Sequence, residues 1–318
     1  MKKLLISRVL PDTVLDAARA VFDVTVRKST APMTLDEVTE ALQTQDAVLP
    51  TLGDAFTAEA FARVPAPRTR LLANFGVGYN HIDVAAARAA GLEVSNTPGA
   101  VTDATADIAM TLILMTCRRA GEGERMVRAG EWEGWHPTQL LGFHVTGKTV
   151  GIVGMGRIGK AIARRCHGGF GMEVVFHNRS RVADPGVPAR QLDSLADVMA
   201  TADIVVLAVP ATPETHHLIG AAELAEMKPS AFLINIARGD VVDEAALITA
   251  LEAGAIAGAG LDVYEREPIV PDALRAMDQV TLLPHLGTSA LEVREAMGLM
   301  AVDNLIAWNE GRPLPNAV

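Results

Sequence analysis

One stretch of the chain constrains its fold more than any other. An apolar run over residues 150–153 leads directly into the pattern G-x-G-x-x-G, whose glycines are Gly154, Gly156 and Gly159, and a helical pattern over residues 160–166 follows. In such a unit the first glycine permits a tight turn, the second lets the backbone approach a pyrophosphate, and the third lets the helix pack against the strand. Free N–H groups and the dipole at the helix start favour phosphates. The stretch therefore predicts a dinucleotide site in a doubly wound parallel sheet.

Apolar runs that alternate with helical patterns predict two parallel sheets. The first series of strand candidates comprises residues 4–9, 24–27, 47–49, 71–75 and 92–95. The second series comprises residues 149–153, 173–177, 204–208, 232–235, 259–263 and 280–283. Residues 102–119 predict a long buried helix, and residues 289–309 predict a closing helix. We therefore expect an α/β protein with two Rossmann-like domains of doubly wound parallel sheet, one flavodoxin-like and one nucleotide-binding, with a cleft between them.

Composition and charge exclude several other classes. The chain has 318 residues, more than the usual size of one domain, and its 49% hydrophobic content argues against disorder. The net charge is −10 and the basic residues form no run that could follow a phosphate backbone, so nucleic acid is a poor candidate partner. The apolar start is too short for a signal peptide, and no run of about 18 apolar residues exists. We therefore expect a soluble, cytoplasmic protein with no membrane contact.

Neither the cysteines nor the histidines show the spacing of a metal site. Cys117 and Cys166 fall in helical patterns and form no spaced pair, so buried thiols are expected rather than a disulfide framework or a zinc site. No histidine shows ligand spacing tied to acids, so we expect no bound metal. The adjacent His216 and His217 are expected in a loop on the cofactor side.

The residues after the strand candidate at 173–177 bear on the choice of cofactor. An NAD enzyme places Asp or Glu here to bind the adenosine ribose, but the sequence reads Asn178-Arg179-Ser180. Arg179 can pair with a 2′-phosphate and Ser180 can donate a hydrogen bond to it, which favours NADP(H) while NAD(H) stays possible. The alternative is that Arg179 is merely a solvated loop cation. The glycine pair at 168–169 leaves the register open by one residue, so His177 could hold the position assigned to Asn178.

Three polar side chains follow apolar strands of the second series, at the edge where open α/β sheets bind their ligands. They are Arg238, Glu267 and His285. Reduction of a keto acid needs a hydride donor, a cation for the carboxylate and an acid that protonates the forming alkoxide. Arg238 can grip a carboxylate with two parallel hydrogen bonds while it polarises the carbonyl. A carboxylate at Glu267 favours the imidazolium form of His285, which is the acid that the reaction needs.

Together with the glycine pattern, these motifs resemble the D-isomer-specific 2-hydroxyacid dehydrogenase family over the whole chain. The resemblance implies that Arg238 binds the substrate carboxylate and carbonyl, that His285 is the general acid and base, and that Glu267 hydrogen-bonds to His285. It also implies a substrate-binding domain, residues 1–99 completed by 287–318, and an NAD(P)-binding domain, residues 100–286. The residues expected to contact the cofactor are Gly154, Met155, Gly156, Arg157, Ile158, Gly159, Asn178, Arg179, Ser180, Val209, Pro210, Thr215, Ile236, Ala237, Arg238, Asp262, His285, Gly287 and Thr105.

The first domain has a candidate site of its own in the motif at residues 74–83. Two close glycines after a strand can expose consecutive N–H groups and form an anion-binding concavity. By resemblance to the family, the backbone of Val77 and Gly78 would bind the substrate carboxylate, and Leu52 would flank the substrate. A plain strand-to-helix turn is the alternative.

Other motifs narrow the resemblance to one branch of the family. Residues 96–99, 103–107 and 132–137 resemble the glyoxylate and hydroxypyruvate reductases. The resemblance implies that Thr105 lies near the cofactor, that the segment with Trp132 and Trp135 lies near the active site, and that the protein is a homodimer held partly by the helix that starts near residue 102. The two tryptophans could equally be core or dimer-interface aromatics.

Alternatives stay open within this resemblance. Another family member, such as a D-lactate, 3-phosphoglycerate, formate or phosphite dehydrogenase, would share the same motifs. A phosphorylated substrate would require extra cations, and the first domain offers no obvious cluster of them. A cofactor-sensing binding protein of the same fold would not need the intact set of Arg238, Glu267 and His285. We therefore expect reduction of a small 2-keto acid such as glyoxylate or hydroxypyruvate, with the preferred acid undecided.

Overall fold

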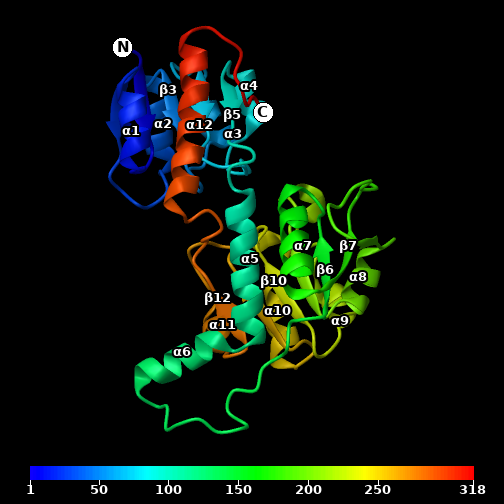
Figure 1. Cartoon of the computed structure of the whole chain (residues 1–318). Coiled ribbons are helices and arrows are strands. Elements are labelled where there is room, and N and C mark those ends of the chain that lie inside the picture. The colour runs from blue at the N-terminus through cyan, green and yellow to red at the C-terminus, as the bar shows by residue number, and fades with distance from the viewer. The chain divides into compact units, whose positions relative to one another are not determined.

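The structure is a computed structural model that describes all 318 residues. It divides into two compact units: unit 1 comprises Met1–Val101 and Ser289–Val318, and unit 2 comprises Thr102–Thr288 (Figure 1). These boundaries lie two residues beyond those expected at positions 99 and 286. The difference arises because the turn before residue 102 stays with unit 1 and the long helix of unit 2 begins only at Thr102.

Unit 1 contains one parallel sheet of five strands in the order β2-β1-β3-β4-β5. Its strands are β1 (Lys3–Ile6), β2 (Asp23–Val26), β3 (Ala47–Leu49), β4 (Leu71–Ala73) and β5 (Glu93–Ser95). Its helices are α1 (Asp12–Arg19), α2 (Leu35–Thr44), α3 (Ala58–Arg63), α4 (Val84–Ala89) and α12 (Leu291–Asn309). The strand order reverses between β1 and β3, and loops at such a reversal are the usual place for a ligand in an open α/β sheet.

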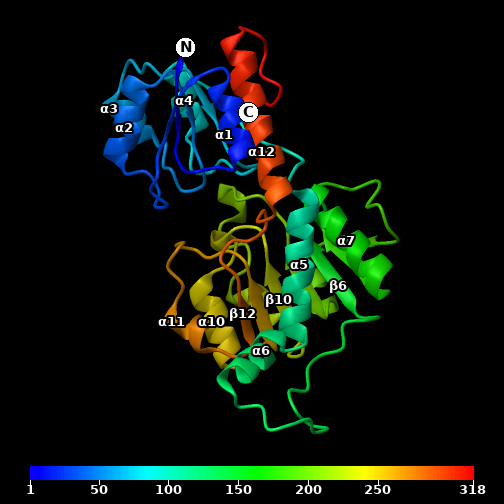
Figure 2. The ribbon, with the colours of Figure 1, turned by 60° about the vertical axis from the view of Figure 1, so that its left-hand side comes forward.

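The C-terminal helix completes the core of this N-terminal sheet. Successive side chains of a strand point to opposite faces, so each strand serves two apolar layers. Leu4 and Ile6 of β1 pack in a cluster with residues of α1 and α12, whereas Leu5 packs with α2, α3 and α4. Figure 2 shows α1 and α12 on one side of the sheet and α2 and α3 on the other. Segments that are far apart in sequence therefore form one unit, because neither covers the sheet alone.

Unit 2 contains a parallel sheet of seven strands in the order β12-β11-β10-β9-β6-β7-β8. Its strands are β6 (Thr149–Val153), β7 (Glu173–His177), β8 (Arg190–Gln191), β9 (Ile204–Leu207), β10 (Phe232–Asn235), β11 (Gly258–Leu261) and β12 (Val280–Leu282). Its helices are α5 (Thr102–Cys117), α6 (Ala120–Ala129), α7 (Arg157–Phe170), α8 (Leu195–Thr201), α9 (Ala221–Ala225), α10 (Glu244–Glu252) and α11 (Asp272–Ala276). The order reverses between β6 and β9, so the glycine loop after β6 lies where such sheets bind dinucleotides.

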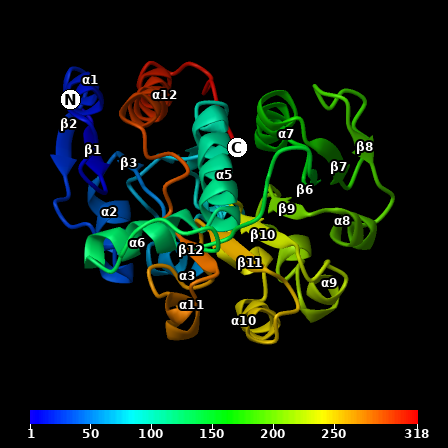
Figure 3. The ribbon, with the colours of Figure 1, turned by 60° about the horizontal axis from the view of Figure 1, so that its bottom comes forward.

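Helices cover both faces of the second sheet. Ile204 and Val206 of β9 belong to the apolar cluster that includes α5 and α7, whereas Val205 and Leu207 belong to the cluster that includes α8, α9 and α10. Figure 3 shows α5 and α7 on one side of the strands and α8 and α10 on the other. Both faces are apolar, which explains why the strands read as continuous hydrophobic runs. The predicted fold class, two doubly wound α/β domains, is therefore confirmed.

The predicted bounds of the helix after the glycine pattern were wrong, and one short strand was missed. The helix begins at Arg157 rather than at residue 160 and continues to Phe170, so Gly159 and the glycine pair at 168–169 lie inside it. Each glycine lowers helix propensity by about 1 kcal/mol, but packing of the buried face of a helix outweighs such costs. The two-residue strand β8 was not predicted, because it contains no apolar run.

Several elements end earlier than expected. Helix α5 ends at Cys117 rather than at residue 119, because Arg119 adopts a left-handed conformation with φ of 53° before α6 begins. Strand β1 ends at Ile6 rather than at residue 9, because its partners β2 and β3 end opposite it at Val26 and Leu49. None of the helices combines the length and the apolar character needed to span a bilayer.

The start of α2 is held by a reciprocal cap. The Thr34 hydroxyl accepts a hydrogen bond from the Glu37 N–H, and the Glu37 carboxylate accepts one from the Thr34 N–H at 2.8 Å. Arg27 donates two further hydrogen bonds to this carboxylate, at 2.8 and 3.0 Å. The hydrogen bond from Arg27 and then that from Thr34 lower the pKa of Glu37 from 4.5 to about 2.

We expect the stabilising contribution of Glu37 to depend on pH. Because its pKa is depressed in the folded chain, the contribution is fully present above about pH 5 and is lost as the pH falls towards the folded value of about 2. The melting temperature of the wild type should therefore exceed that of Glu37→Gln by a constant margin above about pH 5, and this margin should shrink below it. Glu40→Gln, at an exposed position of the same helix, is the control. A margin that persists undiminished at about pH 3 would contradict the assignment.

Candidate functional site

The loop after β6 has the geometry that the glycine pattern predicts. Gly154 has a φ of 98°, a conformation that other residues rarely adopt. A Cβ atom added to Gly159 would lie 2.2 Å from the carbonyl oxygen of Gly154, so only glycine lets α7 approach the strand this closely. A Cβ added to Gly156 would meet no atom within 4 Å. The space beside Gly156 therefore stays open, as a bound pyrophosphate requires.

The amino end of α7 offers unsatisfied donors to this space. Gly156 is the N-cap residue of the helix and has no side chain to accept hydrogen bonds from the first turn. The Met155 N–H donates a hydrogen bond to Oδ1 of Asn178 at 3.2 Å. Uncapped amides at a helix start, together with the helix dipole, form an anion site. Open space and free amides at one place fit a dinucleotide.

The structure decides the register of the residues that follow β7. Val153 of β6 pairs with His177, and Asn178 is the first residue beyond the strand. Asn178, not His177, therefore stands beside the glycine loop. The Asn178 amide also donates to the carbonyl of Ser180 at 3.0 Å, and Arg179 and Ser180 are exposed. Arg179 forms no ion pair within 4 Å, but its charge acts on Glu214, whose pKa is lowered chiefly by a hydrogen bond from Thr212 and in part by Arg179.

A histidine and a carboxylate from different strand ends meet in unit 2. His285 Nδ1 and Glu267 Oε2 are 2.8 Å apart, and the other oxygen of Glu267 accepts a hydrogen bond from the Tyr264 N–H at 3.1 Å. Burial alone would raise the pKa of Glu267, but the hydrogen bond and charge of His285, the Tyr264 amide and the charge of Arg238 together lower it. Glu267 is therefore held as a carboxylate against the imidazole, as the sequence predicts.

Arg238 has a hydrogen-bonding group with no partner in the protein. One of its terminal nitrogens donates to the carbonyl of Ala237 at 2.7 Å, whereas its Nε is buried and has no acceptor. Burial lowers the pKa of Arg238, and the charges of Glu267 and Asp240 oppose this shift. A buried N–H without an acceptor is costly, so a site of this kind gains free energy when a ligand supplies the acceptor. Arg238 thus fits the binding of an anionic oxygen.

A buried carboxylate holds the loop that carries His285. The two oxygens of Asp262 accept hydrogen bonds from the Leu286 N–H at 2.6 Å and the Gly287 N–H at 2.8 Å, and the His285 N–H donates to the Asp262 carbonyl at 2.9 Å. The Thr105 hydroxyl closes the loop from α5, because it donates to the Gly287 carbonyl at 3.1 Å. Burial raises the pKa of Asp262, although the loop amides and His285 counteract it. Three residues predicted to contact the cofactor therefore also shape the loop that carries His285.

Close backbone packing joins the Arg238 loop to the Glu267 loop. A Cβ atom added to Gly239 would lie 1.8 Å from the carbonyl carbon of Tyr264 and 2.2 Å from the nitrogen of Glu265. The two loops can therefore touch only because residue 239 is glycine. This contact fixes Arg238 relative to Glu267, and it was not predicted from the sequence.

The remaining predicted cofactor residues of unit 2 line the same carboxyl edge of the sheet. Val209 and Pro210 follow β9, and the Thr215 hydroxyl donates to the Pro210 carbonyl at 2.7 Å and closes that loop. Ile236 and Ala237 follow β10 and are buried, which leaves them little side-chain surface to offer a ligand. The structure thus brings the predicted residues of unit 2 to one edge.

The predicted substrate residues Leu52, Val77 and Gly78 lie in unit 1. The amide of Asn74 donates to the carbonyls of Gly76 and Gly78 at 3.0 and 3.1 Å, and that of Asn96 donates to the Val77 carbonyl at 2.9 Å. These bonds engage the carbonyls of the loop, while the N–H groups of Val77 and Gly78 have no acceptor in the protein. Free consecutive amides are what the expected anion-binding concavity requires.

Leu52 is held by its backbone and exposes its side chain. It follows β3, next to the reversal of strand order in unit 1. Its carbonyl accepts a hydrogen bond from Arg8 at 3.0 Å, and Arg8 in turn pairs with the fully buried Asp54. This support was not predicted, because Arg8, Leu52 and Asp54 carry no motif that joins them.

The tryptophan-containing segment is not part of the core. Trp132 is 53% exposed and Trp135 is 80% exposed, which excludes one of the alternatives considered from the sequence. The segment follows α6, a helix that buries none of its own residues. Trp132 and Trp135 are therefore largely exposed on the surface of this chain.

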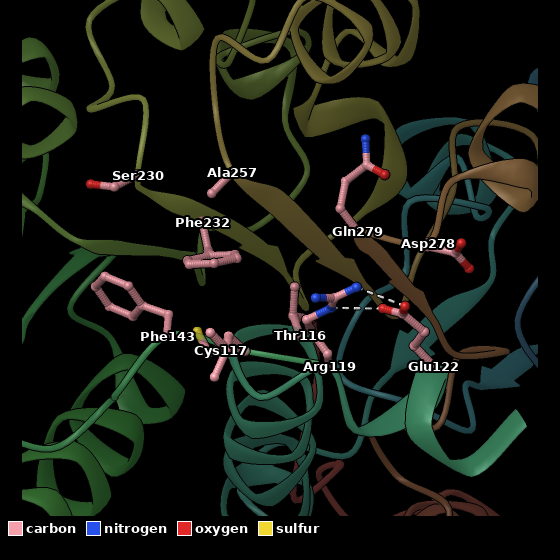
Figure 4. A pocket seen from close by; sticks show the side chains of 12 residues that line it. Thr116, Cys117, Arg119, Glu122, Phe143, Ser230, Phe232, Ala257, Asp278 and Gln279 are labelled. Atoms are coloured by element: carbon pink, nitrogen blue, oxygen red, sulfur yellow. Dashed lines mark hydrogen bonds and ion pairs between the residues drawn. The ribbon is translucent and has the colours of Figure 1, made fainter. Parts of the chain in front are cut away.

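A cavity of about 420 Å³ lies at the opposite, amino edge of the sheet of unit 2 (Figure 4). Phe232 begins β10, Ala257 precedes β11, Gln279 precedes β12, and all three line the cavity. The ring of Phe143 packs against that of Phe232 with a centroid distance of 5.5 Å. None of the predicted catalytic or cofactor residues lines this cavity. It is therefore separate from the candidate site at the carboxyl edge.

Known proteins resemble the chain over nearly its full length. The family model described as D-isomer specific 2-hydroxyacid dehydrogenase, NAD binding domain, matches residues 110–287. A glyoxylate reductase of Thermococcus gammatolerans is 43% identical over 321 residues, which cover 99% of this chain and 95% of that protein. The crystal structure of a glyoxylate reductase from Paecilomyes thermophila matches with a TM-score of 0.88 and 33% identity, and the match covers 100% of this chain and 98% of that one.

A second solved structure contains a nucleotide. The NADPH-dependent glyoxylate/hydroxypyruvate reductase of Sinorhizobium meliloti, in complex with NADP and malonate, matches with a TM-score of 0.86 and 35% identity. The match covers 100% of this chain and 96% of that one.

The second and third glycines of the pattern, Gly156 and Gly159, predict different effects on stability when each is replaced by alanine. Gly156→Ala should lower the melting temperature only slightly, because its Cβ meets no atom although alanine is a poorer N-cap than glycine, but it should weaken dinucleotide binding by about tenfold or more because it fills the space beside α7. Gly159→Ala should lower both stability and binding, because its Cβ collides with the Gly154 carbonyl. Thermal melts and titration with NADP(H) and NAD(H) measure both. Unimpaired binding by Gly156→Ala would refute the assignment of this space to the pyrophosphate.

Proposed function

Because this chain belongs to the D-isomer specific 2-hydroxyacid dehydrogenase family and is therefore an NAD(P)-dependent oxidoreductase, we propose that it reduces glyoxylate and hydroxypyruvate with NADPH. The names of its relatives support a keto acid of the glyoxylate type. The observation that carries the proposal is the Glu267–His285 pair, which lies in the electrostatic field of Arg238, whose buried Nε has no acceptor. An acid and an unsatisfied cation at one sheet edge are what reduction of a keto acid requires.

Arg238 binds and polarises the substrate. Its guanidinium stays charged at working pH, and its unsatisfied Nε–H gains an acceptor when a carboxylate or carbonyl oxygen binds. The field of a preorganised cation stabilises negative charge that develops on the carbonyl oxygen. Because Gly239 presses against Tyr264, the cation needs little reorganisation as the reaction proceeds.

His285 supplies the proton. Its Nδ1 is engaged by Glu267 at 2.8 Å, so Nε2 is the nitrogen left to face the substrate. In the reduction direction the imidazolium gives its Nε2 proton to the oxygen of the former carbonyl, and in the reverse direction the neutral imidazole accepts it. Glu267 keeps the ring oriented and compensates its positive charge, because it remains a carboxylate.

The cofactor supplies the hydride that adds to C2 of the keto acid. Its pyrophosphate would be held by the amides at the start of α7 and by the space beside Gly156. Hydrogen bonds link Thr105 to Gly287 and Gly287 to Asp262. We assign these three residues to contacts with the cofactor near His285. In unit 1 we assign the amides of Val77 and Gly78 to the substrate carboxylate, with Leu52 beside the substrate.

We propose a preference for NADPH over NADH. Asn178 occupies the position where an NAD enzyme has a carboxylate, and the exposed Arg179 has no acidic partner within 4 Å. A carboxylate would repel a 2′-phosphate, whereas a free guanidinium binds it. The solved relative from Sinorhizobium meliloti that contains NADP supports the same preference.

We also propose a homodimer, held partly by the long helix α5 as the resemblance implies and also by α6 and the segment after it. Figures 1 and 2 show this segment looping away from the sheet of unit 2. Val127, Trp132, Trp135 and Leu141 are all exposed there, although large apolar side chains usually gather on a surface only where a partner covers them. Sedimentation equilibrium tests the proposal, and a monomer at micromolar concentration would oppose it.

Substitution of the proposed acid should abolish most of the activity. We expect His285→Gln to lower kcat for glyoxylate and hydroxypyruvate by about 100-fold or more, the usual scale for the loss of an acid catalyst. His144→Gln, an exposed histidine in the same unit, should retain full activity. Steady-state assays with NADPH that follow its absorbance measure both variants. A fully active His285→Gln enzyme would remove the mechanism, and an inactive wild type with every 2-keto acid would remove the proposed function.

Substitution of the proposed phosphate ligand should change cofactor choice. We expect Arg179→Ala to raise the KM for NADPH by about tenfold and to leave that for NADH nearly unchanged, because only the 2′-phosphate uses the guanidinium. Arg118→Ala, which removes an exposed arginine elsewhere in unit 2, is the control. An equal rise in both KM values would show that Arg179 does not discriminate between the cofactors.

A further inference from the structure

Backbone hydrogen bonds join the loops that follow β9 and β10. After the short turn Pro213–Thr215, the His217 N–H donates to the carbonyl of Asp240 at 2.7 Å. Two residues later the Ile219 N–H donates to Val241 at 3.0 Å, and the Asp243 N–H donates back to Ile219 at 2.9 Å. Residues 217–219, which follow the predicted cofactor loop, are thus hydrogen-bonded to residues 240–243, which follow Arg238.

The side chain of His217 reaches the third loop, after β11. Its Nε2 is joined by a hydrogen bond to the carboxylate of Glu265. The backbone of Glu265 is held as well, because its N–H donates to the carboxylate of Glu244 at 3.1 Å. Glu265 lies between Tyr264, whose backbone presses on Gly239, and the catalytic Glu267. His217 therefore connects the β9 loop to the turn that presents Glu267.

This turn determines where the Glu267 carboxylate points. One of its oxygens accepts from the Tyr264 N–H at 3.1 Å, and the other meets His285 Nδ1 at 2.8 Å. The orientation of Glu267 thus depends on the backbone one residue before Glu265. If Glu265 were released, the turn could relax and the oxygen that faces His285 would move with it.

The backbone of His217 adopts a conformation that costs free energy. Its φ of 49° is in the left-handed region, which histidine occupies far less readily than glycine. Such conformations cluster where function demands them and persist only when surrounding contacts enforce them. Here the enforcing contacts are the Asp240 carbonyl and the Glu265 carboxylate.

We infer that His217 is a positioning residue for the acid–base pair: through Glu265 it holds the turn that presents Glu267 to His285. The inference rests on the proposed function, in which Glu267 and His285 act together. It also gives the loop of Pro210 and Thr215, assigned to the cofactor side, a mechanical connection to the proton donor. His217 touches neither reacting atoms nor cofactor in this assignment.

A purely structural ion pair would behave differently, and the chain contains a matched example. The His217–Glu265 pair has side-chain exposures of 37% and 23%, and the Lys228–Asp203 pair, at 2.9 Å in the same unit, has exposures of 38% and 19%. Pairs of this exposure contribute little to stability. Lys228 and Asp203 lie before β10 and β9, at the amino edge of the sheet. Lys228→Ala therefore removes a comparable ion pair without touching the loops of the site.

The experiment compares His217→Ala, His217→Gln and Lys228→Ala in the full-length protein. We expect His217→Ala to lower kcat for glyoxylate with NADPH by about fivefold to tenfold while the KM values change by less than about twofold, a scale typical of coupled neighbours. His217→Gln, which keeps a donor near the Nε2 position, should recover much of the loss, and Lys228→Ala should retain wild-type kcat. An unchanged kcat in His217→Ala, or an equal loss in Lys228→Ala, would overturn the inference.

A double-substitution cycle tests whether His217 acts through Glu267. In a Glu267→Gln background the further substitution His217→Ala should lower kcat by less than about twofold, because the group that His217 positions has already been replaced. If the two losses multiply, His217 acts by another route and the inference is wrong.

A spectroscopic readout separates this inference from the proposed function. Nuclear magnetic resonance of histidine-labelled protein should show the Nδ1 proton that His285 shares with Glu267, assigned by its absence in His285→Gln. We expect this signal to weaken or shift in His217→Ala and to persist in Lys228→Ala. A signal that is unaffected by His217→Ala would overturn the positioning role even if the enzyme reduces keto acids. A signal lost in an enzyme that reduces none would support the positioning role and refute only the proposed function.

Discussion

The buried carboxylate of Asp262 is the interaction on which the candidate site of unit 2 depends. It is 1% exposed, and burial of an isolated carboxylate would be prohibitively costly. The N–H groups of Leu286 and Gly287 compensate that cost, and in doing so they bend the chain after β12 into a loop. His285 begins this loop with a φ of 56°, a conformation that the Asp262 contacts enforce. The end of β11 therefore determines the direction of a side chain that follows β12.

Each predicted anion site has donors without an acceptor in the protein. The first turn of α7 has no side-chain cap, the Nε of Arg238 has no acceptor, and the N–H groups of Val77 and Gly78 donate no hydrogen bond within the protein. Most buried polar groups in proteins are paired, so such exceptions indicate ligand sites. The chain has a net charge of −10, yet the proposed binding of anions needs only these local donors and the exposed guanidinium of Arg179. The net charge of the chain is therefore a poor guide to the charge of its ligand, whereas donors without an acceptor are a good one.

Local patterns in the sequence sufficed to predict the two sheets, the glycine loop and the residues Arg238, Glu267 and His285. Strands buried on both faces read as continuous apolar runs, and polar residues directly after such runs must lie at the carboxyl edge of a parallel sheet. The prediction missed the helix start at Arg157 and the strand β8, because neither is marked by an apolar pattern. The exposed position of Trp132 and Trp135 could not be predicted either, because aromatic residues suit a core and an interface equally.

The sequence by itself thus determined which residue types stand at the ends of which strands, and with them the class of chemistry. Only the tertiary structure decided which of these strand ends contact one another. Asp262 accepts hydrogen bonds from the loop of His285, Gly239 packs against the backbone of Tyr264, and His217 bonds to Glu265. The physical reason is that periodicity and turn preferences act over a few residues, whereas these contacts join segments that the strand order brings together. A hydrogen bond between a side chain and a backbone group far away in the sequence produces no regular residue spacing. The role of such a side chain is therefore visible only in the folded structure.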